Sequence, residues 1–100
     1  MPRQALRDYE LVFILSPDIP EEEVPAAIER VTQAVTSRGG EVKEVDGWGR
    51  KKLAYPINGH AEGNYVLTQV RLDPARTAEL EAGFHISEEV IRHLLVRVGE

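Results

Sequence analysis

The segment of residues 48–58 reads Trp-Gly-Arg-Lys-Lys-Leu-Ala-Tyr-Pro-Ile-Asn. In it, three adjacent cations at residues 50–52 lead into an apolar alternation of Leu53, Tyr55 and Ile57. Successive side chains of a strand point to opposite faces of a sheet, so this alternation predicts a strand that buries one row of side chains. The segment therefore predicts an extended element that carries concentrated positive charge at its start. This charge suits a polyanion bound there, or it is an ordinary solvated strand end.

The residues on either side of this segment predict one long strand followed by a hairpin. The strand begins near Glu41, and its hydrophobic period breaks between Val42 and Val45. Glycines flank Trp48 on both sides, which is typical of a bulge or kink within a strand. We expect Trp48 to pack near this bulge rather than to stack on a base, because large aromatic side chains are commonly structural. Residues 58–63 predict a hairpin loop, and residues 64–72 predict the next strand.

A strand and then a helix are predicted before the long strand. Residues 9–15 alternate as a strand does. The helix that follows ends near residue 38, at a Gly-Gly pair that suits a left-handed C-cap. Two signals compete for its start: Asp18 and Glu21 would form a capping box, whereas Pro25 is tolerated only near the first turn. The inner stripe of this helix contains Val24, Ile28, Val31 and Val35.

A second helix and a last strand complete the chain. Asp73 predicts the N-cap of this helix and Pro74 its first position. Residues 90–98 predict an apolar strand, whose facing stays open because Arg92 and His93 interrupt the alternation. The inner stripe of the second helix contains Thr77, Leu80 and Phe84.

The predicted order is strand, helix, strand, strand, helix, strand, which is an α+β fold of the ferredoxin-like βαββαβ type. We expect residues 1–100 to form a single domain, with a four-stranded antiparallel sheet and both helices on one face. The core rows are then Tyr9, Leu11, Phe13 and Leu15, and Val66, Thr68, Val70 and Leu72. The open face receives Val12, Ile14, Tyr65, Leu67, Gln69 and Arg71. Such a face suits a protein partner or stacked bases, or is ordinary scattered apolar surface.

Composition narrows the class of protein. With 42% hydrophobic and 29% charged residues, the chain reads as an ordinary globular protein. It contains no cysteine, which excludes disulfides and thiolate metal sites. No apolar run approaches the roughly 20 residues of a membrane helix, and no secretion signal is apparent.

The charges are segregated along the chain, although the net charge is -5. Acidic residues gather on or beside the predicted helices. Cations belong to the strands and to the residues before the first strand, so the strand side can be locally positive and can bind a polyanion such as RNA. These cations are Arg3, Arg7, Arg50, Lys51, Lys52, Arg71, Arg92 and Arg97.

Several of these motifs together resemble the bacterial ribosomal protein family numbered six in the small subunit. The most specific match is the Leu-Ala-Tyr-Pro-Ile block of residues 53–57 after a basic pair. Other matches fall in the right order and are Tyr9-Glu10, Trp48-Gly49-Arg50, Asn58, Tyr65-Val66-Leu67 and Val90-Ile91-Arg92. The fold of this family is the ferredoxin-like one predicted from periodicity.

The resemblance implies a structural, non-enzymatic role in the cytoplasm, within the small ribosomal subunit. Members of the family bind the central domain of the small-subunit (16S) ribosomal RNA as a heterodimer with the eighteenth small-subunit protein. No cofactor, membrane or small-molecule substrate is expected. Carried onto this chain, the RNA-binding residues are Arg3, Arg7, Arg50, Lys51, Lys52 and Arg92. The apolar open face supplies the expected partner-binding residues Val12, Ile14, Tyr65 and Leu67.

The main alternative is a single-strand RNA binder of the RNA-recognition-motif type, which shares this topology. That module stacks bases on aromatic side chains of its first and third strands. Here only Tyr65 lies on the exposed row, because Tyr9 and Phe13 fall on the core face. This alternative predicts that Tyr65→Ala abolishes single-strand binding.

Two further alternatives are a hydrolase resembling acylphosphatase and a small-molecule regulatory dimer. A phosphate cradle needs free backbone N–H groups after the first strand, whereas this chain has Ser16-Pro17-Asp18 there. The three histidines, His60, His85 and His93, show no metal-ligand spacing. A regulatory dimer explains the apolar face but leaves the cations of residues 50–52 without a role, and it predicts a stable homodimer by light scattering.

Overall fold

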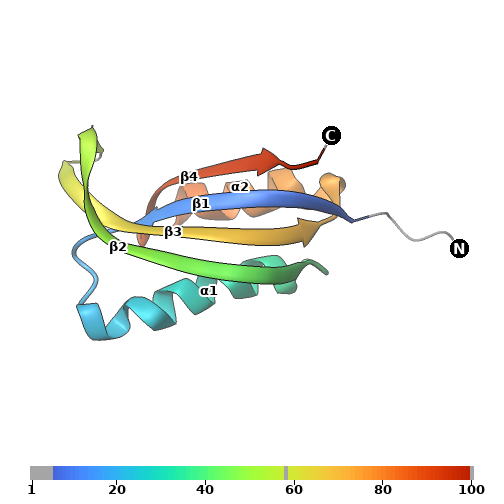
Figure 1. Ribbon diagram of the computed structural model, residues 1–100, viewed down its shortest axis with the longest axis horizontal. Helices are drawn as coiled ribbons and strands as arrows, with labels where there is room; N and C mark the ends of the chain where they lie inside the picture. Colours follow the sequence, from blue (N-terminus) through green and yellow to red (C-terminus); the bar gives the residue numbers. More distant parts are fainter. Residues whose placement is uncertain (1–5, 58, 100) are drawn as a thin grey trace, which may run out of the picture.

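The computed structural model describes residues 6–57 and 59–99, and in these ranges the chain forms four strands and two α-helices (Figure 1). A short 3-10 helix leads into each α-helix. The elements are β1 (Arg7–Leu15), η1 (Glu21–Glu23), α1 (Val24–Thr36), β2 (Glu41–Ile57), β3 (His60–Leu72), η2 (Pro74–Arg76), α2 (Thr77–Ile86) and β4 (Val90–Arg97). None of the helices described is long and apolar enough to cross a membrane.

The four strands form one antiparallel sheet in the order β2-β3-β1-β4. Both helices lie on the same side of the sheet, as Figure 1 shows. The predicted ferredoxin-like arrangement is therefore confirmed. β1 and β3 occupy the centre of the sheet, and β2 and β4 form its edges.

The hydrophobic core lies between the sheet and the helices, and its strand rows are those predicted by the alternation. Thr68 is the polar member of the β3 row, and its hydroxyl donates a hydrogen bond of 2.9 Å to the carbonyl of Leu11. This bond matters because an unpaired buried hydroxyl is costly. The buried apolar cluster contains Tyr9, Leu11, Phe13, Leu15, Ala27, Val31, Val35, Val66, Val70, Leu72, Leu80, Phe84 and Val90.

The ladder between β1 and β4 settles the facing of the last strand. Phe13 pairs with His93, so the imidazole lies on the helix-covered side and contacts the ring of Phe84 at a centroid distance of 5.1 Å. Val12 pairs with Leu94, which therefore lies on the open side. The alternation is interrupted in the sequence because the core-facing position is taken by a histidine, His93, and a neighbouring open-side position by Arg92.

The start of the first helix differs from one of the two predictions. Asp18 does not cap the helix: its backbone N–H donates to the hydroxyl of Ser16 at 3.1 Å, within the connection after β1. The 3-10 turn η1 comes first, and Pro25 occupies the first turn of α1. The proline signal was therefore correct and the capping box was wrong. At the other end, Gly39 adopts a φ of 80°, as the predicted left-handed cap requires.

The β2–β3 hairpin is longer than predicted. Both predicted irregularities are present, since the ladder register shifts between Val42 and Glu44 and between Gly47 and Gly49. The predicted loop over residues 58–63 is wrong, because Ile57 pairs with His60 and only the Asn-Gly pair of residues 58 and 59 separates the strands. Two-residue Asn-Gly connections are the favoured hairpin turns.

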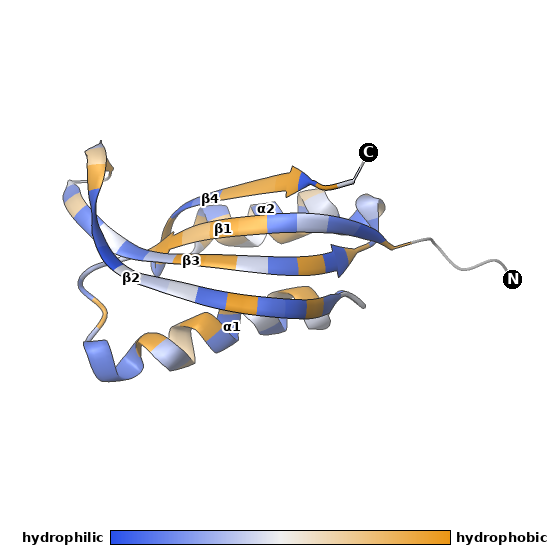
Figure 2. Cartoon of the chain, viewed as in Figure 1, coloured by the Kyte–Doolittle hydropathy of each residue, from blue (hydrophilic) through white to orange (hydrophobic). Residues whose placement is uncertain are grey.

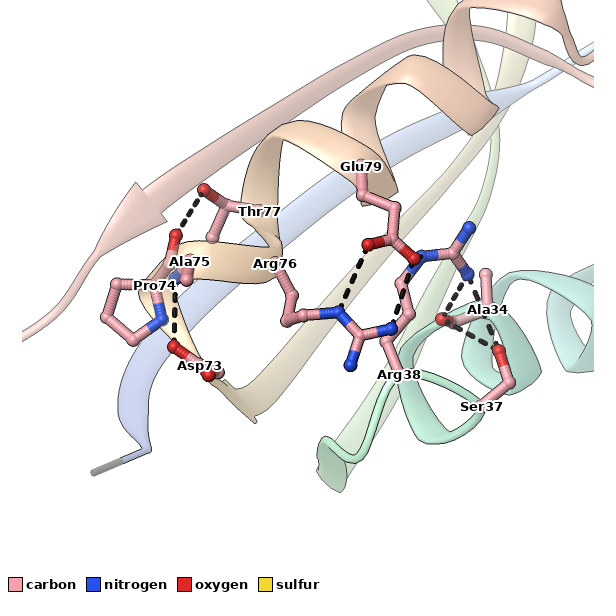
Figure 3. Close-up of polar contacts among 9 residues, drawn as sticks. All are labelled: Ala34, Ser37, Arg38, Asp73, Pro74, Ala75, Arg76, Thr77 and Glu79. Atoms are coloured by element: carbon pink, nitrogen blue, oxygen red, sulfur yellow. Dashed lines mark hydrogen bonds and ion pairs between the residues drawn. The ribbon is translucent and has the colours of Figure 1, made fainter. Parts of the chain in front are cut away.

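A cluster of polar contacts ties the end of α1 to the start of α2 (Figure 3). The guanidinium of Arg76 donates two hydrogen bonds of 3.1 Å to the carboxylate of Glu79. The Nε of Arg38, from the end of α1, lies 3.2 Å from Oε2 of the same carboxylate. These contacts lower the pKa of Glu79, chiefly through the Arg76 hydrogen bonds. Nearby, Asp73 caps η2 as predicted, accepting from the N–H of Ala75 at 2.9 Å.

Candidate nucleic-acid and partner interface

The open face of the sheet brings the four predicted partner-binding residues together. On β1 and β3, Val12 pairs with Leu67 and Ile14 pairs with Tyr65, so the four side chains form two neighbouring rows. Val12, Tyr65 and Leu67 are half-buried, whereas Ile14 is only 5% exposed. Ile14 is therefore much less accessible from the open side than the other three side chains.

The outer part of the hairpin bends over one end of this face. We call residues 51–57 of β2 and 60–63 of β3 the arm; Figure 1 shows it rising out of the sheet toward the β4 side. Gly49, with a φ of 83°, lies just before the arm, where the ladder is irregular. The Nη1 of Arg92, on β4, donates a hydrogen bond of 2.9 Å to the hydroxyl of Tyr55, on the arm. This contact joins the two edges of the sheet across its open face.

A pocket of about 230 Å³ lies between the arm and the sheet. Val12 and Ile14 contribute from β1, and Arg92 and Leu94 from β4. The arm contributes Leu53, Ala54, Tyr55 and Ile57, and Tyr65 and His93 complete the lining. The arm was not predicted to bend over the face, so the sequence reasoning missed Leu53, Ile57 and Leu94 as functional candidates. The alternation of Leu53, Tyr55 and Ile57 was the available signal.

The opposite end of the open face is polar. The carboxylate Oδ1 of Asp8 lies 3.3 Å from the Nε of Arg71 and 3.8 Å from the Nζ of Lys43. Gln69 donates to Glu10 at 3.4 Å. Along β1, Figure 2 shows hydrophilic residues toward the start of the strand and hydrophobic residues toward its end. On β1 and β3, the apolar part of the open face therefore lies in the half beside the arm, whereas on β4 the exposed Val96 lies opposite Glu10 in the polar half.

The basic triplet lies at the base of the arm, but its members differ in their contacts. The Nη2 of Arg50 donates to the carbonyl of Pro17 at 2.9 Å, and its Nε lies 3.6 Å from Glu62. Lys51 pairs with Gly63 and Lys52 with Glu62, so the two lysines point to opposite faces of the hairpin. Both are exposed, and the ion pairs of the described residues include neither. The lysines are thus the cations of the triplet that are available to a ligand.

The other predicted RNA-binding cations are not gathered into the same patch. Arg92 lies on the open face beside the pocket. Arg7 begins β1 at the far end of the sheet, roughly 23 Å along the strand from the Ile14 position that pairs with Arg92. Arg3 lies outside the described residues. The structure therefore brings Arg50, Lys51 and Lys52 together and separates them from Arg7.

Trp48 lies at the predicted bulge but is not a core residue. Its side chain is 46% exposed, and its indole N–H donates to Asp46 at 3.1 Å. The reason is its position in an edge strand, within a run of exposed residues from Lys43 to Lys52. Trp48 is therefore a candidate contact residue next to the basic triplet.

The geometry offers no support for a catalytic or metal site. No group of three metal-ligating side chains occurs among the described residues. His93 is almost buried, and its Nε2 lies 2.8 Å from the carboxylate of Glu81, on α2. In the connection after β1, the N–H of Ser16 is bonded to the carbonyl of Glu89 and that of Asp18 to the Ser16 hydroxyl. A phosphate cradle at this connection is therefore not formed.

Comparison with known proteins identifies the family. Residues 8–97 match the model of the family described as ribosomal protein S6. The chain belongs to this family. It is 43% identical over 95 residues to the small ribosomal subunit protein bS6 of Moorella thermoacetica, covering 95% of this chain and 97% of that protein. The bS6 protein of Desulforamulus reducens is 41% identical over 95 residues, which cover 95% of this chain and all of the relative.

A solved structure agrees with the fold. The crystal structure of 30S ribosomal protein S6 from Thermotoga maritima superposes with a TM-score of 0.85 at 35% sequence identity. The match covers 93% of this chain and 88% of the other. Family membership confirms the resemblance inferred from the residue motifs, and it assigns the chain to a class of structural, non-enzymatic ribosomal proteins.

Proposed function

We propose that this chain binds the central domain of 16S ribosomal RNA as a heterodimer with the eighteenth small-subunit protein. The proposal starts from family membership, since the relatives are named as small ribosomal subunit proteins and such a component binds ribosomal RNA and other ribosomal proteins. Our proposal adds the identity of the RNA domain and the identity of the protein partner.

The observation that carries the proposal is the placement of an apolar half-face next to exposed cations. The arm supplies both, with Lys51 and Lys52 at its base and Leu53 and Ile57 toward the pocket. The apolar half-face suits a protein, because contiguous exposed apolar surface commonly marks an interaction site. The lysines suit phosphates, because each phosphate contact releases counterions.

The cations divide into two groups in this proposal. Lys51 and Lys52 are the primary phosphate contacts, since they are exposed and unpaired with any described carboxylate. Arg50 supports them by holding the connection after β1. Arg3 and Arg7 remain proposed RNA contacts, with Arg7 at the far end of the sheet reaching a separate part of the RNA. Arg92, also expected from the sequence to bind RNA, differs from them because it lies beside the apolar pocket and is bonded to Tyr55.

The test is binding to a central-domain RNA fragment, with and without the protein partner, across a salt series. We expect tight binding only with the partner, because a few phosphate contacts give a salt slope of roughly -0.7 to -0.9 each and only modest affinity. The double variant Lys51→Ala/Lys52→Ala should weaken binding and reduce the magnitude of the slope by about 1.4 to 1.8. The charge-matched control is Lys43→Ala/Arg76→Ala, whose side chains lie away from the arm. Equal losses in the two double variants would refute a local RNA site.

The protein half of the proposal is tested at Leu67. This side chain is half-buried on the open face, so Leu67→Asp should abolish heterodimer formation while leaving the fold intact. Circular dichroism checks the fold, and pull-down of the partner checks the interaction. Unchanged pull-down would show that the open face is not the partner surface.

A further inference from the structure

The pocket under the arm has features that specify its occupant more closely than an apolar surface does. Its volume of about 230 Å³ is below the roughly 300–1,000 Å³ that is usual for small-molecule sites. It is open on one side, and aliphatic groups of Val12, Ile14, Leu53, Ile57 and Leu94 form much of its wall. Its size and lining suit one large apolar side chain presented by another protein.

The pocket is lined on one side by a cation, Arg92. Among the described residues that line it, Arg92 is the charged one, and none is a carboxylate. Its hydrogen bond to the hydroxyl of Tyr55 uses one of the five N–H donors of a guanidinium. That bond also fixes the position of the guanidinium, so its remaining N–H donors are oriented beside the apolar pocket. A carboxylate is the protein group that matches an oriented guanidinium best.

We propose that the pocket receives an aliphatic side chain of the protein partner, and that Arg92 binds a carboxylate adjacent to it in the partner's chain. The inference rests on the proposed function, because the partner is the eighteenth small-subunit protein. It assigns Arg92 to protein recognition rather than to the RNA. Leu94 forms the exposed wall of the site, at 55% exposure, and Tyr55 is the residue that positions Arg92.

A nucleobase is a poorer match to this pocket than an aliphatic side chain. The edges of a base carry both donors and acceptors, and the free N–H groups of Arg92 could pair only with the acceptors. A base would therefore leave donors unpaired in an apolar site, which is costly. The hydroxyl of Tyr55 is already bonded to Arg92, and His93 is bonded to Glu81 on the other side of the sheet. Tyr65 is half-buried in the wall, so its ring is not presented as a free stacking platform.

Calorimetric titration of the full chain with the eighteenth small-subunit protein tests the inference. Leu94→Ala removes part of the wall and Arg92→Gln removes the charge. The matched control is Val96→Ala, because Val96 is 43% exposed on the same strand and face but does not line the pocket. We expect at least a tenfold loss of affinity for each pocket variant and less than a twofold loss for the control. Thermal unfolding should show all three variants folded.

The salt dependence of the Arg92 effect tests for the carboxylate. The affinity ratio between wild type and Arg92→Gln should shrink as salt rises, because screening weakens a charge pair. Arg92→Lys should recover part of the loss. A ratio that does not change with salt would overturn the carboxylate contact.

The remaining outcomes separate this inference from the proposed function. If both pocket variants still bind the partner with wild-type affinity, the pocket is not the binding site, but the proposed heterodimer is unaffected. If the wild-type chain does not bind the partner, both the pocket inference and the proposed heterodimer are wrong. If Arg92→Gln weakens binding to the central-domain RNA fragment and leaves partner affinity unchanged, the site belongs to the RNA. If light scattering shows a homodimer that Leu94→Ala dissociates, the occupant is a second copy of the chain.

Discussion

The two faces of the sheet come from the same strands but are closed in different ways. On the helix-covered face, α1 and α2 bury the β1 row so fully that Phe13 has no exposed surface. On the open face, the arm is the only described segment that covers the sheet, and Leu94 keeps 55% of its surface exposed. One face therefore supplies most of the folding free energy, whereas the other keeps apolar surface for a partner. Substitutions one residue apart in a strand should then separate stability from binding.

The largest expected effect comes from the covered face. Phe13→Ala should lower the free energy of unfolding by about 3–5 kcal/mol, because it leaves a cavity in a packed core. Its neighbour Val12 is half-buried on the open face, and Val12→Ala should cost only about 1 kcal/mol. Urea denaturation of the two variants measures the difference. Similar losses would mean that the open face contributes to stability as the covered face does.

An intermediate effect is expected at Gly63, where the arm meets the open face. A Cβ added here would overlap with the Cγ2 of Ile14 and would lie 3.0 Å from the backbone oxygen of Leu15. The backbone oxygen cannot move aside easily, so Gly63→Ala should destabilise the protein by about 1–3 kcal/mol.

Gly83 provides the matched control, because it lies within α2 and an added Cβ there meets nothing within 4 Å. Gly83→Ala should stabilise the protein by about 0.5–1 kcal/mol through helix propensity. Opposite signs for the two glycine substitutions would show that close packing, and not glycine flexibility, decides the effect at Gly63. Destabilisation by both would contradict this explanation.

The rows of the sheet were predictable because side-chain alternation is a local property. The alternation of residues 9–15 and 66–72 already separates the two faces, and the structure confirms both core rows. Asp73 was also predictable as a cap, because its hydrogen bond spans only two residues. Asp18 was not, because the competing contact of its N–H with Ser16 belongs to a connection whose course depends on distant residues such as Arg50.

The candidate site was predictable in its residues but not in its shape. The motif of residues 53–57 and the apolar residues of β1 and β3 were identified separately. What brings them together is the bend of the arm and the bond between Tyr55 and Arg92, which are 37 residues apart. Gly63 was the last residue of the predicted loop of residues 58–63, whereas in the structure it belongs to β3, where a side chain would collide with Ile14.

The smallest expected effect concerns the outer surface of the covered face, where Glu79 links α2 to α1. Hydrogen bonds from Arg76, and then the charges of Arg76 and Arg38, lower the pKa of Glu79 from its ordinary value of 4.5. A depressed carboxyl pKa contributes stability at pH values above the ordinary pKa, and this contribution is lost as the pH falls through the folded-state pKa. Glu79→Gln should therefore reduce stability slightly at pH 7, and the difference from the wild type should vanish in acid. Urea midpoints measured from pH 7 to pH 2 would show this convergence, with Glu29→Gln, an exposed position on α1, as the control. A Glu79→Gln difference that persists unchanged at pH 2 would mean that shape, and not charge, joins the two helices, and that the covered face is held by its core alone.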